Sequence, residues 1–379
     1  MKRTLLLSCL ITVFTAIAVC QSVTLPPSGD NQKCAVTQNI GSLVKVTVKY
    51  SSPDVTSPAG ENRTGKIWGT GIAHYGMIDQ GFGLGKPAPW RAGANESTTI
   101  HFSHDVLIGG KPLAAGSYGL FLMLAENGPW TWIFSKNTSG WGSYFYEEKD
   151  DVLRVQVQPQ DHPFTEWLTY TFTDRKPTEA TLELQWELKS IPMHISVPHM
   201  NDLYIAQIEK EFQGSTGFVA ANYTAAANFL LEQNHNLPKA LEWVNEGMRM
   251  PFFGRTNFES LTTQAQILLK MNNRDEAMAA LEKAVEMPDA TVFQLHHLGR
   301  NLVAGGAKQE ALRIFTLNYE KHNAAWPASV GMARGLSAVG RYDEALEYAK
   351  VALAEAPDQV NKDSLARMIE MLKEGKDVN

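Results

Sequence analysis

The chain has little cysteine, no strongly basic segment and only one long hydrophobic run. Three cysteines occur in 379 residues, and two of them, Cys9 and Cys20, lie in the first twenty. Once that segment is removed only Cys34 remains, so no intramolecular disulfide can form and the protein must be stable by packing alone. No run of Lys and Arg exceeds two residues and the net charge is -6, which excludes a nucleic-acid-binding surface.

The hydrophobic run covers residues 5–19 and follows Lys2 and Arg3. It is too short for a spanning helix, and a basic start before an apolar run is typical of a secretory signal. We therefore expect a signal peptide over residues 1–20, an exported protein in the periplasm or outside the cell, and no transmembrane segment after cleavage. Lipid anchoring at Cys20 is an alternative, but Val19 stands where a small residue is normally needed.

Known catalytic and cofactor motifs are also absent. The sequence has no G-x-S-x-G elbow and no phosphate-binding loop, so no catalytic residue, cofactor or reaction is predicted. His101, His104 and Asp105 invite a metal site, but strand alternation places His104 on the face opposite the other two. No metal site is predicted either.

Short strand patterns recur within residues 40–198. Val44, Val46 and Val48 alternate with polar residues, and further short strands are expected near 98–105, 130–135, 152–157, 167–173 and 181–189. Residues 117–124 are apolar on both faces, which is typical of a central strand. In the last run the residues expected to point inward are Leu182, Leu184, Trp186 and Leu188. Short strands joined by turns, with no helical pattern between them, predict an antiparallel β-sandwich or barrel. The polar, proline-containing residues 21–39 before it are expected to be a flexible leader.

A repeat dominates the second half. Ala240, Ala277, Ala311 and Ala345 lie 37, 34 and 34 residues apart, each early in a stretch of helical periodicity. Self-similarity at this period indicates stacked helix-turn-helix units, in which alanine allows helices to approach closely. We expect a linker helix within 199–217, repeats over 218–379, and a final amphipathic helix near 362–373 that caps the array.

The repeats resemble tetratricopeptide repeats. The residues that carry the resemblance are Gly340, Tyr342, Ala345, Ala352 and Pro357 in the fourth repeat and Leu298, Gly299, Gly306, Ala311 and Phe315 in the third. The resemblance implies a concave groove that binds peptides or protein segments. The groove candidates are Asn222, Asn228, Gln264, His297, Arg300, Asn301 and Arg334. The alternative is a solvated helix face without a ligand.

The first half resembles a bacterial family known only as domain of unknown function 2911. The matching strings are Val48-Lys-Tyr50-Ser-Ser-Pro53, Lys66-Ile-Trp68-Gly69, Trp90-Arg91-Ala-Gly93-Ala-Asn95-Glu96, Gly110-Lys111-Pro112 and Trp132-Ile-Phe134-Ser135-Lys136. The resemblance covers about residues 40–197, and an insertion with Gly81 and Gly85 interrupts it. It implies a fold and a secreted setting, and no mechanism.

The polar string from Arg91 to Glu96 is the main ligand-binding candidate in the β half. Arg91, Asn95 and Glu96 lie just ahead of a strand and could converge on a polar ligand, with arginine as a fork for carboxylate or phosphate. The alternative is structural, an Arg91–Glu96 pair with Asn95 bracing a turn. His101 and the loop-borne Trp141 complete the candidates, and Trp141 also suits carbohydrate stacking.

The sequence thus predicts a two-domain α+β protein, an antiparallel β-sandwich or barrel followed by an all-α tetratricopeptide-like solenoid. Its predicted function is an interaction scaffold that binds a protein or peptide partner through the helical repeats. The alternative is a small polar ligand or sugar, or an uncharacterised enzymatic reaction, at a β pocket near Arg91, Asn95 and Glu96.

Overall fold

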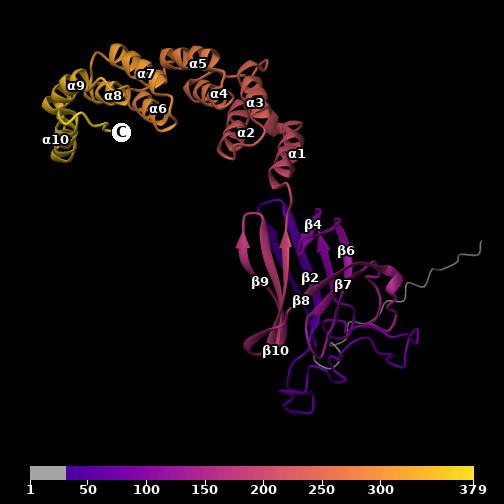
Figure 1. Ribbon diagram of the computed structural model, residues 1–379. Helices are drawn as coiled ribbons and strands as arrows, with labels where there is room; N and C mark the ends of the chain where they lie inside the picture. Colours follow the sequence, from indigo (N-terminus) through magenta and orange to yellow (C-terminus); the bar gives the residue numbers. More distant parts are fainter. Residues whose placement is uncertain (1–30) are drawn as a thin grey trace, which may run out of the picture. The chain divides into compact units, whose positions relative to one another are not determined.

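The computed structural model describes residues 31–379, which divide into two compact units (Figure 1). The first ends at Met200 and the second begins at Asn201. The predicted signal peptide and the first part of the predicted leader lie outside the described residues. Within 31–379, no helix has both the length and the apolar character that crossing a membrane requires.

The first unit is a sandwich of two antiparallel sheets. Its strands are β1 (Gln32–Ile40), β2 (Val44–Ser52), β3 (Thr99–Phe102), β4 (Val106–Ile108), β5 (Lys111–Leu113), β6 (Gly116–Met123), β7 (Trp130–Ser135), β8 (Asp151–Val157), β9 (Gln160–Lys176) and β10 (Glu179–Ser196), with a 3-10 turn η2 (Glu148–Asp150). One sheet has the order β1-β2-β3-β6-β7-β8 and the other β5-β4-β10-β9. The antiparallel β fold expected from the alternation is confirmed.

Alternating side chains fill the space between the sheets. Val44, Val46 and Val48 of β2 are fully buried, as the period-two pattern predicts. Trp132 of β7 crosses to the other sheet, where its indole N–H donates to the Pro192 carbonyl at 3.2 Å. The core is therefore closed by both packing and hydrogen bonds between the sheets.

The predicted leader is wrong over its described part, because residues 32–40 form β1. This strand pairs with β2 along its whole length, from Gln32 opposite Ser52 to Ile40 opposite Val44. Residues 32–40 are mostly polar, so the sequence pattern did not indicate a strand. An edge strand gains main-chain hydrogen bonds from one neighbour and needs few apolar side chains.

The inward pattern of β10 also breaks at one point. Leu182, Leu184 and Trp186 are fully buried as expected, but Leu188 is 45% exposed and Glu187 is only 3% exposed. Register shifts on both sides of Glu187 and its φ of 53° form a bulge, which turns the next side chain to the opposite face. The Glu187 carboxylate accepts from Gly65 N at 2.7 Å and from Trp68 Nε1 at 2.9 Å, so its burial is compensated by hydrogen bonds.

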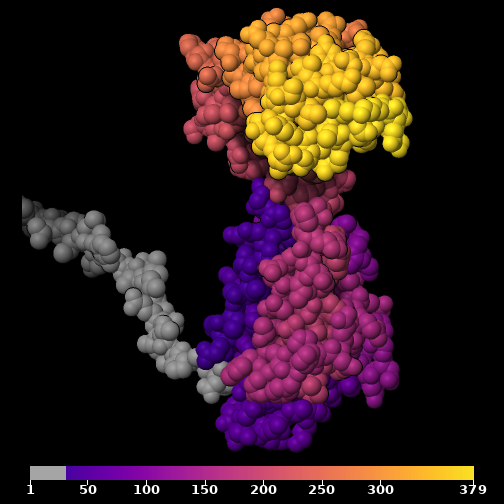
Figure 2. Space-filling model, turned by 90° about the vertical axis from the view of Figure 1, so that its left-hand side faces the viewer, coloured from indigo at the N-terminus to yellow at the C-terminus, as the bar shows by residue number. Residues whose placement is uncertain are grey.

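The second unit is an array of antiparallel helix pairs. Its elements are α1 (Met200–Phe212), η3 (Ser215–Phe218), α2 (Ala220–Glu232), α3 (Leu237–Arg249), α4 (Phe258–Lys270), α5 (Arg274–Glu286), α6 (Val292–Ala304), α7 (Lys308–Lys321), α8 (Trp326–Ala338), α9 (Tyr342–Glu355) and α10 (Gln359–Lys373). The four repeat alanines are fully buried, as their packing role predicts. In the space-filling view the last helices, in yellow, form a continuous surface at the end of the array (Figure 2).

The expected linker helix belongs to this array. Phe212 at the end of α1 stacks on Tyr223 of α2 with ring centroids 4.0 Å apart, and Ile205 joins the same buried cluster. α1 therefore covers the apolar face of the first helix pair, which the sequence alone left open.

Phe315 of α7 is seated between three glycines of the neighbouring helices. A Cβ atom at Gly299 of α6, or at Gly331 or Gly335 of α8, would lie 2.4 to 2.8 Å from carbon atoms of the Phe315 ring. No real Cβ tolerates such a distance, so the three glycines are required for this ring to lie between α6 and α8. We call this arrangement the Phe315 socket.

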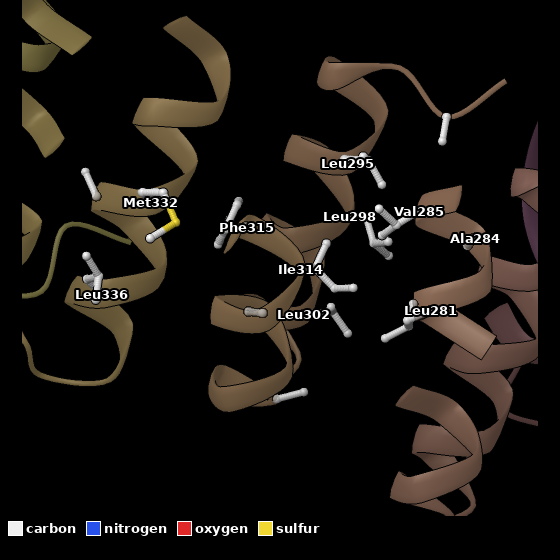
Figure 3. Packing of buried hydrophobic residues seen from close by; sticks show 14 of the residues in the cluster. Leu281, Ala284, Val285, Leu295, Leu298, Leu302, Ile314, Phe315, Met332 and Leu336 are labelled. Atoms are coloured by element: carbon white, nitrogen blue, oxygen red, sulfur yellow. The ribbon is translucent and has the colours of Figure 1, made fainter. Parts of the chain in front are cut away.

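A continuous buried cluster extends from α4 to α10. Leu281 and Val285 of α5 lie toward Leu298 and Ile314 of the next repeat, and Met332 lies beyond Phe315 (Figure 3). The second repeat is the pair α4–α5 and the third is the pair α6–α7. These two pairs contact each other less than other neighbouring pairs do, mainly where α5 meets α7. Side chains rather than helix backbones therefore hold the second and third repeats together.

Removing the Phe315 ring should unfold the array at lower denaturant. We expect Phe315→Ala to lower the free energy of unfolding by about 3–5 kcal/mol, because a fully buried ring leaves a cavity that rigid helices cannot close. Phe293→Ala is the matched control, since Phe293 of α6 is 57% exposed. Urea unfolding followed by circular dichroism at 222 nm measures both; equal losses would contradict the socket.

Candidate functional site

A pocket of about 260 Å³ opens beside the polar string of the β unit. Its floor is aromatic: Trp90 and Trp186 stack with centroids 6.0 Å apart and planes at 10°. Trp68 packs edge-on against both rings, and its N–H is held by Glu187. The bulge in β10 thus fixes the tryptophan floor of the pocket.

Arg91 and Asn95 both line this pocket. The Arg91 guanidinium donates to the Asn95 carbonyl at 2.9 Å and lies 5.2 Å from the ring centroid of Tyr144. A Cβ at Gly142 would lie 2.5 Å from Arg91 Cζ, so the loop backbone packs directly on the guanidinium. Arg91 is therefore held in one place with part of its hydrogen-bonding edge left for a ligand.

The backbone between these residues is strained. Ala92 has φ 51° and is fully buried, although the left-handed region costs an alanine about 1 kcal/mol or more. Its carbonyl accepts from Tyr170 Oη at 2.9 Å and from Thr98 Oγ1 at 3.0 Å, and these bonds hold the conformation. Strain maintained by two buried hydroxyls is typical of functional sites.

Buried polar atoms without partners occur near Arg91. His74 is 8% exposed, and neither ring nitrogen has a hydrogen-bond partner among the described residues. Burial lowers the pKa of His74, and the charge of Arg91 lowers it further. Ser143, next to Gly142, is 1% exposed and its hydroxyl also lacks a partner in the described chain. The sequence pattern gave no reason to connect these two residues with Arg91.

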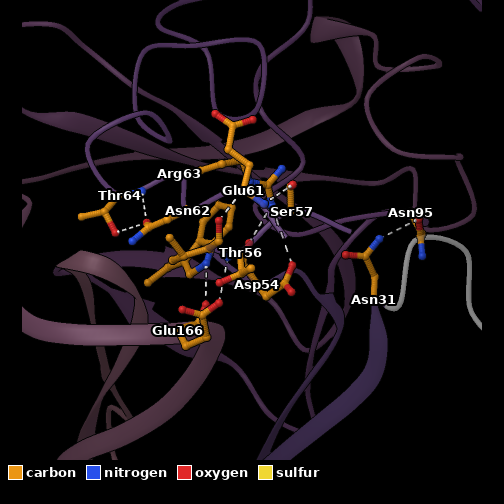
Figure 4. Close-up of polar contacts among 12 residues, drawn as sticks. Asn31, Asp54, Thr56, Ser57, Glu61, Asn62, Arg63, Thr64, Asn95 and Glu166 are labelled. Carbon is orange, nitrogen blue, oxygen red and sulfur yellow. Dashed lines mark hydrogen bonds and ion pairs between the residues drawn. The ribbon is translucent and has the colours of Figure 1, made fainter. Parts of the chain in front are cut away.

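Polar contacts brace the pocket rim (Figure 4). Arg63 donates from Nε to the Val55 carbonyl at 3.0 Å and from Nη2 to the Asp54 carbonyl at 2.9 Å. Asn31 donates to Asn95 Oδ1 at 3.5 Å. The second arginine of the pocket is thus engaged with its own loop, whereas Arg91 faces the pocket.

The structure separates the other predicted ligand residues. Glu96 does not pair with Arg91: it forms an ion pair with Lys33 of β1 at 2.7 Å, and this bond holds the pKa of Glu96 below its usual range. His101 lies on the outer face of β3, hydrogen-bonded to Ser117. Trp141 is 49% exposed on the loop that covers Arg91. The predicted Arg91–Glu96 pair is therefore wrong, because β1 supplies a nearer cation.

No group of three or more His, Cys, Asp and Glu side chains in residues 31–379 is placed to hold a metal. No feature of the pocket favours a sugar over other polar ligands.

A larger groove, of about 610 Å³, lies in the helical array. Its walls come from the ends of α2, α4 and α6, from the start of α5 and from the loop between α6 and α7. The lining residues include Asn228, Leu231, Gln266, Leu269, Asn301 and Leu302. Asn228 and Asn301, both predicted from sequence, therefore line one groove.

The remaining groove candidates lie elsewhere. Asn222 donates to the Thr216 carbonyl of η3, and Gln264 donates to Asn245 of α3. Both therefore serve local packing. Arg300 and Arg334 lie at the next junction, between α6 and α8, where burial lowers the pKa of Arg334 and the charge of Arg300 lowers it further.

His296 is half-buried at that same junction, with its Nδ1 atom fully buried. Its Nδ1 has no hydrogen-bond partner within residues 31–379. The centroid of its ring lies 5.8 Å from the centroid of the Phe315 ring. Burial lowers its pKa to about 4, with Arg334 and Arg300 adding to the shift. A proton on His296 therefore opposes the packing of α6 against α8.

Stability of the array should fall on acidification. The pKa of His296 is about 4 in the folded state and about 6.5 unfolded, so between these values the unfolded chain binds more protons. We expect up to about 3 kcal/mol of stability, present above pH 6.5, to be lost as the pH falls to 4. His296→Asn should flatten the curve and His297→Asn, on the exposed side of α6, should not. Urea unfolding at several pH values measures the slope.

Two family models cover the described chain. Residues 31–195 match the model described as a protein of unknown function (DUF2911), and residues 175–379 match the model of the coatomer epsilon subunit. The second match spans more than half of the chain. The chain belongs to the coatomer epsilon subunit family. The match that shows this covers β10 and the helical array, while residues 31–195 carry the DUF2911 match that the sequence strings predicted.

Solved structures with similar helical arrays cover part of the chain. YrrB, described as a TPR protein with an unusual peptide-binding site, is 18% identical with a TM-score of 0.29, over 43% of this chain and 86% of YrrB. A tetratricopeptide repeat protein from Parabacteroides merdae is 17% identical with a TM-score of 0.30, over 45% and 66% of the two chains. MamA from Desulfovibrio magneticus is 14% identical with a TM-score of 0.27, over 42% and 95%. No curated protein matches the chain.

Proposed function

We propose that this protein is exported and that its helical array holds an extended segment of a partner protein. The observation that carries the proposal is the groove of about 610 Å³ lined by α2, α4 and α6. Export is supported by the basic start and the apolar run of residues 5–19.

The lining chemistry suits a peptide. Gln266 and Asn301 carry amides that both donate and accept, which matches the alternating N–H and C=O groups of an extended chain. Asn228 adds its amide N–H groups, while its Oδ1 accepts from Thr263 at 2.8 Å. Leu231 and Leu302 supply apolar contacts between them. A few polar groups on an apolar wall are typical of sites that bind one segment in one register.

Both cations at the groove edge are already engaged. Lys270 donates to the Leu231 carbonyl at 2.8 Å, and Arg274 pairs with Glu310 at 2.7 Å. The groove therefore presents amides, apolar side chains and the Glu232 carboxylate rather than a cationic clamp. This supports recognition of a peptide main chain over recognition of a single charged end.

A photo-crosslinking residue at position 266 should trap the partner in the native envelope. We expect adducts from position 266 and none from position 286, because Gln266 lines the groove while Glu286 is exposed on α5. Peptide mapping should place every adduct in one extended segment, and Asn228→Ala with Asn301→Ala should reduce the yield about tenfold. Equal yields at 266 and 286, or scattered sites, would rule out the groove.

A second candidate function rests on the β unit. Arg91, the unpartnered His74 and the strained Ala92 together favour a small carboxylate or phosphate ligand in the tryptophan-floored pocket. A bound anion would offset the charge of Arg91 and so raise the pKa of His74.

Titration of the histidine by NMR tests this candidate. Saturating succinate or inorganic phosphate should raise the pKa of His74, and Arg91→Met should abolish the effect. Arg175→Met is the matched control, because Arg175 is exposed at the end of β9. An unchanged His74 pKa with both anions would leave Arg91 a structural residue.

A further inference from the structure

The residues after α10 fold back onto α8. Gly375, with φ 67°, reverses the chain, and the amides of Gly375 and Lys376 donate to the carbonyls of Leu372 and Met371. Figure 1 shows this segment leaving α10 and ending beside the array. We call residues 376–379 the strap.

The strap is bound through its main chain. Arg334 Nη1 donates to the Val378 carbonyl at 3.1 Å, and the Val378 amide donates to Ser337 Oγ at 3.1 Å. The Asn379 amide group donates to the Arg334 carbonyl at 3.1 Å. Both polar main-chain groups of Val378 are therefore recognised, which is how peptide-binding grooves hold an extended ligand.

Side chains of the strap add an acidic and an apolar contact. The Ser337 hydroxyl donates to Asp377 Oδ1 at 3.1 Å, and Lys308 lies 3.5 Å from Asp377 Oδ2. The Val378 side chain packs against the buried cluster of the array. Ser337 is fully buried, and within residues 31–379 its hydroxyl bonds to Asp377 and Val378 of the strap.

The α8 face has polar and charged groups that the strap does not pair with. Arg334 Nε and His296 Nδ1 are buried without partners among residues 31–379, and Arg300 adds a second positive charge. Asp377 is the one acidic side chain that the structure pairs with Lys308 or Ser337 in the described chain. An occupant with further acidic groups would therefore bind this face better than the strap does.

We propose that the strap occupies a peptide site on α8 in cis, and that an extended acidic segment of the partner replaces it. This rests on the proposed function and names the partner's chemistry: an Asp or Glu beside Ser337 and Lys308, followed by an aliphatic residue in the place of Val378. The strap is then both a model of the ligand and its competitor.

The strap should weaken the binding of an external peptide by a factor that its tether sets. A short tether gives the strap an effective concentration in the millimolar range, so a strap that binds with a dissociation constant of about 0.1 mM masks the site about tenfold. Removing residues 376–379 should strengthen the binding of an external peptide by about that factor.

The test uses a fluorescent peptide with the sequence of residues 374–379, Glu-Gly-Lys-Asp-Val-Asn, which contains the strap, and measures fluorescence anisotropy. The chain that ends at Gly375 should bind it, and the full chain should bind it about tenfold more weakly. In the shortened chain Arg334→Ala should abolish binding. Arg313→Ala is the matched control, because Arg313 pairs with Glu282 away from the strap. Replacing Asp by Ala in the peptide should also abolish binding.

A full-length variant tests the same proposal in case the shortened chain does not fold. In the full-length protein Asp377→Ala with Val378→Ala should release the strap and allow the peptide to bind as in the shortened chain. Absence of peptide binding to both folded variants overturns the strap proposal, as does binding that Arg334→Ala leaves unchanged. The crosslinks from position 266 would persist in that case, so the two proposals fail separately.

Discussion

The close approach of α6, α7 and α8 around Phe315 is the constraint on which the second half of the molecule depends. Three glycines on two helices leave a space that one ring fills, and this fixes the distance between neighbouring repeats. His296, Arg334 and Ser337 are all placed by the same packing. A buried apolar contact thus sets the geometry of the polar groups beside it.

In the β unit, a buried acidic residue fixes the geometry of the pocket. Glu187 is buried at a bulge and holds the indole of Trp68, which in turn packs against the stacked pair of Trp90 and Trp186. The pocket beside Arg91 is therefore built on a hydrogen-bonded carboxylate rather than on packing alone. Loss of that carboxylate would leave buried donors unpaired and loosen the aromatic floor.

The regular elements could be predicted from sequence because periodicity and burial are directly linked. The valines of β2 and the repeat alanines have the burial that their spacing implies. β1 could not be predicted, since an edge strand needs no apolar pattern. Leu188 was placed on the wrong face because a one-residue bulge leaves no mark in composition.

For the sites, Arg91 with Asn95 and Asn228 with Asn301 lie together as residue chemistry suggested. His74, Ser143 and the strap depend on contacts distant in sequence, which no local pattern encodes.

The thin contact between the second and third repeats has a mechanical consequence. A stack of helix pairs behaves as an elastic ribbon, and its joints differ in stiffness with the number of atoms in contact. α5 meets the third repeat mainly through α7, so this joint bends most easily. The groove lined by Asn228 and Asn301 lies across the joint. Tension along the array would therefore widen the groove first, while compression would close it on whatever it holds.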